Sequence, residues 1–323
     1  MEERAQAQAA LVDVHIRSGD FAAAEAESLS MRARLQRAGQ LGRHLLLDTL
    51  IAGHRLVLGE TQAMLDEYPR LLQRWVHQYG PDFRTVASVN AQYAEALERA
   101  GRFDEAVAAT REARRIARRA PTDSLDVIGL DRFLARRLLR AGHGGEAEGV
   151  AAALDAELAG RTQPDALGTR VQTLVLLADI ALDRGDVQAA AAFQEQARSL
   201  LASVPAQHPF HARAARAVQR LQAELCLWQG DAACAAAEAE AAIATARDLR
   251  EDPTELVQAR LLHLNAVRAL GDRARAEVLA AGYRDETVAF AGPCSTYTLA
   301  LRAAPGVPTL RALSASTAGS CAP

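Results

Sequence analysis

Three arginines have the spacing in this chain that is best suited to recognition chemistry. Arg132, Arg136 and Arg140 lie four residues apart in a segment of helical periodicity, so they form one stripe along a helix face. A guanidinium group pairs bidentately with a carboxylate, and a stripe of three is suited to an acidic peptide segment. The alternative is a solvated face with internal salt bridges, and the sequence leaves both interpretations open.

A second basic segment is denser but less specific. The favoured interpretation is that this segment forms an exposed helix on a convex surface of the protein. The alternative is that it binds RNA or a membrane surface. The segment lacks the interleaved aromatic residues of nucleic-acid platforms, and the formal net charge of the chain is only −3. We therefore expect neither nucleic acid nor membrane as the partner. The segment consists of Arg111, Arg114, Arg115, Arg118 and Arg119.

Catalytic and cofactor chemistry has no support in the motifs. All 37 basic residues are arginine, which excludes a phosphate-loop lysine and a Schiff-base lysine. No G-x-S-x-G or H-E-x-x-H motif occurs, and the glycine-rich run 142–149 follows a helical pattern rather than a strand. We expect no enzyme activity, no cofactor and no metal site.

The elements that must position these arginines are helices. Alanine, the best helix former, contributes 72 of the 323 residues, whereas aromatic residues make up only 4%. An all-β fold needs β-branched and aromatic residues, so the composition excludes it.

A repeat of about 42 residues organises the chain. Seven glycines, each followed by a polar or charged residue, lie 40 to 45 residues apart. Alanine stands five residues after six of them and seven residues before five of them, for example at Ala106 and Ala94 around Gly101. Glycine can end a helix in the left-handed conformation, and small residues let two antiparallel helices pack closely. The glycines are Gly19, Gly59, Gly101, Gly142, Gly185, Gly230 and Gly271.

These columns resemble the tetratricopeptide repeat. The clearest copy runs from Tyr93 to Ala106 and includes the family's aromatic residue at Phe103, and its length is similar to the longer, kinesin-light-chain-like variety. The resemblance covers about residues 5–290 and implies an all-α, right-handed solenoid of about seven antiparallel helical hairpins. The aromatic position matches only at Phe21 and Phe103, and HEAT-like repeats are the alternative fold.

The resemblance also implies where a partner binds. In that family, the first helix of each hairpin lines a concave groove that holds peptides. The residues on the groove-facing side of the first helix in three consecutive copies are therefore expected to face a ligand. The acidic residues among them either hold the arginines in place or neutralise them. The groove-facing residues are Glu95, Arg99, Arg132, Arg136, Arg140, Asp179 and Asp183.

The ends and the cysteines give further expectations. We expect residues 1–291 to form the repeat array and residues 292–323, rich in Pro, Ser, Thr, Ala and Gly, to be a disordered or weakly ordered tail. A helix can begin at Glu2 with no capping repeat before it, which suggests a fragment of a larger protein. Four cysteines without a C-x-x-C pair, and a charged start without a signal peptide, predict reduced thiols in a cytoplasmic protein. The Ala/Arg bias suggests a GC-rich bacterial genome.

The sequence therefore predicts a non-enzymatic scaffold that binds a peptide or helical segment of a partner protein in its groove, with an acidic segment as the expected ligand. The alternative is the sensory repeat region of a larger bacterial serine/threonine kinase or transcriptional regulator. The sequence does not determine the oligomeric state.

Overall fold

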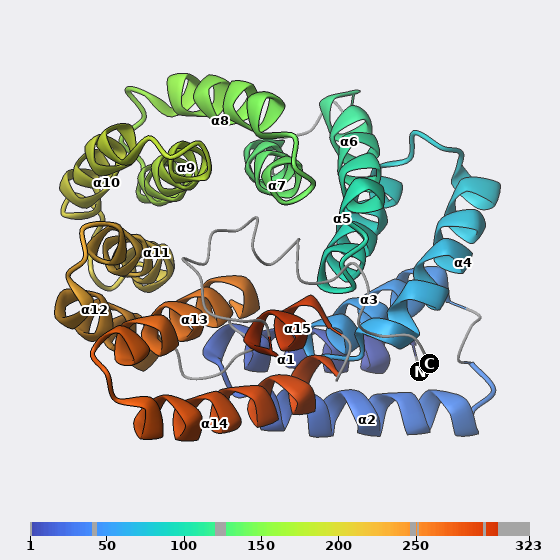
Figure 1. The fold of residues 1–323 in the computed structure, drawn as a ribbon. Coiled ribbons are helices and arrows are strands. Elements are labelled where there is room, and N and C mark those ends of the chain that lie inside the picture. The colour runs from blue at the N-terminus through green and yellow to red at the C-terminus, as the bar shows by residue number, and fades with distance from the viewer. Residues whose placement is uncertain are drawn as a thin grey trace. The chain divides into compact units, whose positions relative to one another are not determined.

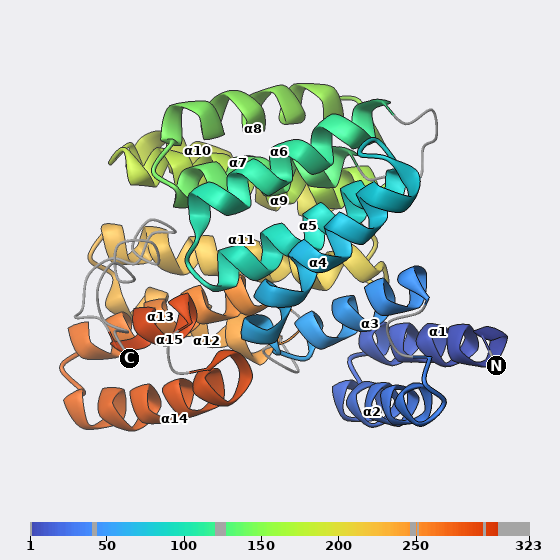
Figure 2. The same ribbon diagram turned by 90° about the vertical axis from the view of Figure 1, so that its right-hand side faces the viewer.

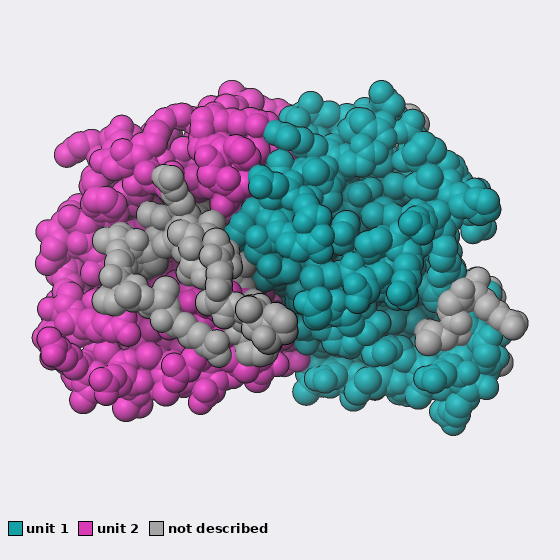
Figure 3. Space-filling model, turned by 45° about the vertical axis from the view of Figure 1, so that its right-hand side comes forward, with its two compact units in different colours: residues 1–127 teal, residues 128–323 magenta. Residues whose placement is uncertain are grey.

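The computed structural model describes residues 2–40, 44–119, 127–245, 250, 252–292 and 295–302. Within these ranges every regular element is an α-helix, fifteen in all (Figure 1). The chain divides into two compact units, residues 1–127 and residues 128–323, which Figure 3 colours separately.

The first unit consists of three helical hairpins. In each pair the second helix packs against the first, and α1 and α2 lie side by side in both ribbon views (Figures 1 and 2). The helices are α1 (Glu2–Ser18), α2 (Phe21–Arg37), α3 (Leu45–Val57), α4 (Thr61–Tyr79), α5 (Arg84–Arg99) and α6 (Phe103–Arg119).

The second unit contains the remaining helices, which lie in two layers apart from the last. Figure 1 shows α7, α9, α11 and α13 in one layer, and α8, α10, α12 and α14 in a second layer outside it, while α15 packs on α13 and α14. The helices are α7 (Val127–Arg140), α8 (Gly144–Leu158), α9 (Pro164–Asp183), α10 (Val187–Leu201), α11 (Pro209–Trp228), α12 (Ala232–Ala244), α13 (Pro253–Ala269), α14 (Arg273–Ala291) and α15 (Thr296–Arg302).

The seven predicted glycines all end a helix in the left-handed conformation. Their φ angles lie between 76° and 102°, a region that glycine enters without the steric penalty of a side chain. After each one, the next residue donates its N–H to the carbonyl five residues earlier, as Arg102 does to Leu97 at 2.9 Å. This closes the helix end and turns the chain back on itself.

The two small-residue columns are buried, as the hairpin model requires. At the position five residues after each glycine, the exposed fraction is at most 1%, and at the position seven before it is at most 2%. Ala94 and Ala106 are both 0% exposed, on α5 and α6, which pack against each other. The register assigned from the sequence is therefore confirmed.

Four of the hairpin turns have an additional cap that the sequence analysis did not predict. Where aspartate follows the glycine, its carboxylate accepts a hydrogen bond from the backbone N–H three residues on, at 2.9 to 3.1 Å. A Gly-Asp pair thus ends one helix and caps the next. The aspartates are Asp20, Asp186, Asp231 and Asp272.

The expectation of reduced thiols is wrong for two of the four cysteines. Cys226 and Cys234 form a disulfide across the turn at Gly230, because the hairpin brings the end of α11 beside the first turn of α12, with a Cα–Cα distance of 5.9 Å. Cys294 and Cys321 lie outside the described residues. The disulfide removes one reason for expecting a cytoplasmic protein, since disulfides persist mainly in oxidising compartments.

Candidate functional site

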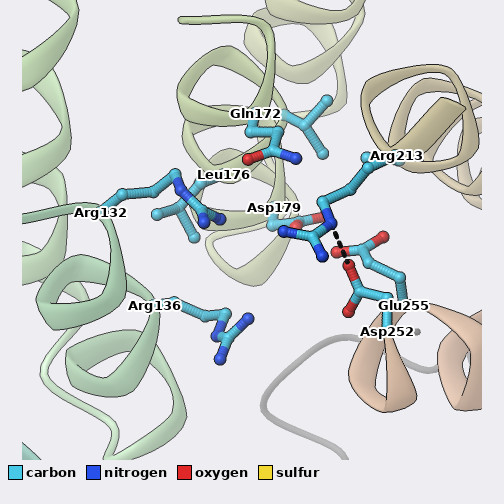
Figure 4. Close-up of a pocket in the computed structure, with 10 residues that line it drawn as sticks. Arg132, Arg136, Gln172, Leu176, Asp179, Arg213, Asp252 and Glu255 are labelled. Atoms are coloured by element: carbon cyan, nitrogen blue, oxygen red, sulfur yellow. Dashed lines mark ion pairs between the residues drawn. The ribbon is translucent and has the colours of Figure 1, made fainter. Parts of the chain in front are cut away.

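A small pocket opens on the first layer of the second unit. All four helices of that layer contribute to it, since the side chains come from α7, α9, α11 and the start of α13 (Figure 4). The lining residues are Arg132, Arg136, Gln172, Val175, Leu176, Asp179, Arg213, Ala217, Asp252 and Glu255.

One wall of the pocket is basic. Arg132 and Arg136 extend from α7 towards the opening (Figure 4). Both guanidinium groups lie over the ring of Phe133, with Cζ 4.6 Å and 5.2 Å from the ring centroid. This cation–π contact restricts the two long side chains and so lowers the entropy that a ligand must remove.

The opposite wall contains a buried ion cluster centred on Arg220 of α11. The side chain of Arg220 is 0% exposed, and it donates two hydrogen bonds to Asp179 on α9, at 2.5 and 2.9 Å. Its Nε donates to Glu255 of α13 at 3.1 Å, and its Nη1 to Glu224 at 3.2 Å. One guanidinium therefore joins three of the four helices that line the pocket.

The cluster has more carboxylates than cations. Glu224 is 1% exposed, and burial, followed by the nearby Asp179 and Glu255, raises its pKa to about 8 against the partial compensation of Arg220. Burial likewise raises the pKa of Glu255. At neutral pH Glu224 therefore holds a proton. Asp179 and Glu255 are the two carboxyls that remain to balance the charge of Arg220.

The rim of this wall has a looser ion pair. Arg213 Nε lies 3.7 Å from an oxygen of Asp252, just before α13 (Figure 4). The side chain of Arg213 is 45% exposed and that of Asp252 is 16% exposed, so the pair is partly solvated.

The predicted site residues separate into two groups. Arg132, Arg136 and Asp179 line the pocket, whereas Arg140, although on the same stripe, is 1% exposed and does not. Successive i, i+4 positions on a helix rotate by about 40°, so Arg140 lies about 80° around α7 from Arg132. Asp183 likewise lies beyond the pocket, next to Gly144 at the start of α8.

Glu95 and Arg99 belong to the first unit and pair with each other. Arg99 is 3% exposed, donates to Glu95 at 3.0 Å and donates to the backbone oxygen of Leu56 at 2.5 Å. A guanidinium used this way stabilises the packing of α5 on α3.

The second basic segment forms ion pairs on the first unit. Arg115 donates to Asp82 at 2.6 Å and to Glu112 at 2.7 Å, and Arg119 lies 3.5 Å from Asp82. The Arg115 hydrogen bond holds the pKa of the Asp82 carboxyl below its usual value. These contacts fit the interpretation of an exposed, salt-bridged helix better than that of a nucleic-acid surface.

Sequence reasoning missed Arg213, Arg220, Glu224, Asp252 and Glu255. A weak signal for Arg220 was present, since it stands 41 residues after Asp179, close to the 40- to 45-residue spacing of the repeat. The repeat period brings such positions into contact on adjacent helices. Among the described residues, no group of three or more His, Cys, Asp or Glu side chains is placed to hold a metal ion. No described helix is long and apolar enough to cross a membrane.

Comparisons with known proteins identify the fold. No family model and no curated protein matches the sequence. The crystal structure of a Rap protein complexed with Competence and Sporulation Factor aligns with a TM-score of 0.52 at 13% identity, covering 89% of this chain and 92% of that one. BtubC (BKLC) from P. vanneervenii aligns at 0.44 with 18% identity, covering 71% and 89%, and the human IFIT1 dimer with PPP-AAAA at 0.47 with 14%, covering 87% and 63%.

The chain therefore has a tetratricopeptide-like helical-repeat fold.

Proposed function

We propose that the chain is a non-enzymatic scaffold that holds an acidic peptide segment of a partner protein in the pocket of the second unit. The observation that carries this proposal is the convergence of the first helices of four consecutive hairpins on one pocket whose α7 wall presents Arg132 and Arg136. The same binding mode would serve the sensory region of a larger bacterial regulator, the alternative that the sequence raises.

The charges around the pocket favour an anionic ligand on the α7 wall. Asp179 and Glu255 on the opposite wall already receive hydrogen bonds from Arg220, and Asp252 faces Arg213. Arg132 and Arg136 lie next to each other on one turn of α7, so they can approach a single carboxylate, or two carboxylates in neighbouring residues.

The similarity to the Rap structure supports a ligand-binding role. That protein has the same fold over nearly its whole length and is complexed with Competence and Sporulation Factor. For the present chain we infer that the ligand is an extended segment rather than a folded domain, because side chains of four helices line one small pocket.

A peptide array tests the proposal. Decapeptides with graded numbers of Asp and Glu, and matched peptides with Asn and Gln in their place, would be probed with the purified protein. We expect capture to increase with carboxylate content. The best acidic peptide, labelled with fluorescein, should then bind in solution with an affinity that falls as salt rises, since screening weakens exposed charge pairs.

Equal capture of acidic and amide-substituted peptides would contradict the acidic preference. Capture of none of the peptides, with the protein folded by circular dichroism, would contradict the peptide-binding role itself. The nucleic-acid alternative is tested in the same format with a labelled single-stranded oligoribonucleotide, which we expect not to bind.

A further inference from the structure

The Arg220 cluster contains a titratable group that neither wall of the pocket needs for binding. Glu224 does not line the pocket, is 1% exposed and lies behind Asp179, against the same guanidinium. A buried carboxyl with only one charge-assisted contact is expensive to ionise, because burial removes its hydration. Its presence among apolar helices therefore calls for an explanation beyond packing.

The geometry shows which carboxyl of the cluster takes the proton. Asp179 receives both Nη groups of Arg220, the fork geometry of an ionised carboxylate. Glu255 receives Nε and is 15% exposed, so it keeps some contact with solvent. Glu224 is fully enclosed and accepts only the longest of the four hydrogen bonds. Of the three carboxyls, Glu224 is therefore the one that loses the least favourable interaction when it is protonated.

The charged groups around Glu224 come from three helices. Asp179 faces it from α9, Arg220 from its own helix α11, and Glu255 from α13, with Asp252 beyond Glu255. With Glu224 neutral, the four innermost groups carry a net charge of −1, and with Glu224 ionised they carry −2. The added charge appears immediately behind Asp179, which lines the pocket.

We propose that Glu224 is a proton switch for the pocket: its neutral form permits an anionic segment to bind beside Arg132 and Arg136, and its ionised form repels that segment. This inference rests on the proposed function and adds its regulation. Loss of a proton buried in the Arg220 cluster, rather than on the ligand or at the surface, then links mildly alkaline pH to release.

The expected size of the effect follows from the charge and its depth. If the extra negative charge is taken to lie about 10 Å from the ligand, an effective dielectric of about 20 to 30 gives a binding of a singly charged anionic group that is about 5- to 15-fold weaker. The change should occur between about pH 7 and pH 9, around the raised pKa of Glu224. Below pH 7 the affinity should be constant until Glu255, whose pKa is also raised by burial, the histidines or the peptide titrate.

The test compares the wild-type protein with Glu224→Gln, an isosteric stand-in for the neutral carboxyl. The probe is the best acidic decapeptide from the array, with blocked termini and without His, Cys, Tyr or Lys, so that the probe does not titrate between pH 6.5 and 9.5. Fluorescence anisotropy would give Kd at half-unit steps of pH. We expect wild-type Kd to rise about 5- to 15-fold across this range and the Kd of the variant to stay within about 2-fold.

A second readout follows the proton directly. In protein labelled with ¹³C at glutamate side-chain carboxyls, the resonance missing from Glu224→Gln should titrate near pH 8 in the wild type without any peptide. Titration below pH 6 would overturn the inference regardless of the ligand. Equal pH dependence of Kd in the two proteins would also overturn it.

The two proposals can fail separately. If the carboxyl titrates near pH 8 but no peptide binds to either protein at any pH, the proposed function is contradicted, and the switch falls with it. If the peptide binds and only the pH comparison fails, the pocket stands and the switch is wrong.

Discussion

Arg220 and Asp179 lie 41 residues apart in the chain, yet their side chains form a fully buried, two-bond ion pair. The separation is four residues, about one helical turn, shorter than the 45 residues between Gly185 and Gly230. A side chain on α11 thus reaches α9 in the hairpin before it. The same spacing brings His54 to Asp13 at 3.0 Å in the first unit. Polar ties between consecutive first helices are thus a recurrent feature of this fold, and at Arg220 they also form the wall of the pocket.

The first prediction concerns this ion pair. Arg220→Met would leave Asp179, Glu224 and Glu255 buried without their shared cation, and breaking a buried pair from one side costs about 3–5 kcal/mol. We expect a large drop in the free energy of unfolding measured by urea denaturation. Arg198→Ala, which removes an exposed arginine on α10 that pairs with Glu195, is the matched control and should leave the midpoint unmoved.

If Arg220→Met unfolds no more easily than the control, the cluster does not hold the three helices together. The double change Arg220→Met with Asp179→Leu separates the two contributions. It should regain part of the loss, because removal of both partners leaves fewer charges buried.

The second prediction tests the repeat register. Ala106→Leu places three extra carbon atoms in the contact between α5 and α6, where Ala106 is 0% exposed. Overpacking of this kind costs about 1–3 kcal/mol. The control is Ala108→Leu, an exposed position on the same helix. In thermal denaturation Ala106→Leu should melt at a lower temperature than Ala108→Leu. Equal melting temperatures would mean that α5 and α6 do not pack closely at Ala106.

The third prediction concerns stability and pH. The pKa of Glu224 is raised from 4.5 to about 8 in the folded protein, so between these values the folded state keeps a proton that the unfolded chain has released. The contribution of this group is therefore complete below about pH 4.5 and is lost as pH rises towards 8. Glu224→Gln stays neutral throughout and escapes that loss.

We expect the melting temperature of Glu224→Gln, relative to wild type, to increase steadily from pH 5 to pH 8.5 and then level off. In free energy of unfolding, the advantage of the variant over wild type at pH 8.5 should be on the order of 2–4 kcal/mol, since one pKa unit corresponds to about 1.4 kcal/mol. A difference that is the same at pH 5 and pH 8.5 would show that Glu224 is ionised in the folded protein at both.

The fold was accessible from the sequence because its determinants are local or strictly periodic. Gly101 ends its helix in the left-handed conformation, and the alanines at positions 94 and 106 must be small because two backbones meet there. Such requirements recur at each copy, so seven weak signals reinforce one another. The capping role of Asp186 is equally local, since its carboxylate accepts from a backbone N–H three residues on.

The site was only partly accessible, for two physical reasons. Helical phase drifts by about 40° per four residues, so a stripe that starts in the pocket at Arg132 leaves it by Arg140. The Arg220 cluster depends on tertiary contacts between three repeats, and no column of the alignment marks which polar residues meet.

The central claim is that the α7 wall of the pocket binds an acidic segment, and Arg136→Glu tests it most directly. The reversal places a like charge in front of the ligand and removes charge-assisted hydrogen bonds worth roughly 1.5–3 kcal/mol. Arg198→Glu makes the same charge change on α10, outside the pocket, and controls for the net field of the protein.

The measurement is the Kd of the best acidic decapeptide by fluorescence anisotropy at pH 7 and low salt, alongside the melting temperature of each protein. We predict that Arg136→Glu weakens binding at least about tenfold with little change in melting temperature, whereas Arg198→Glu leaves Kd within about twofold of wild type. Binding by Arg136→Glu that matches wild type, in a protein that melts normally, would contradict the account.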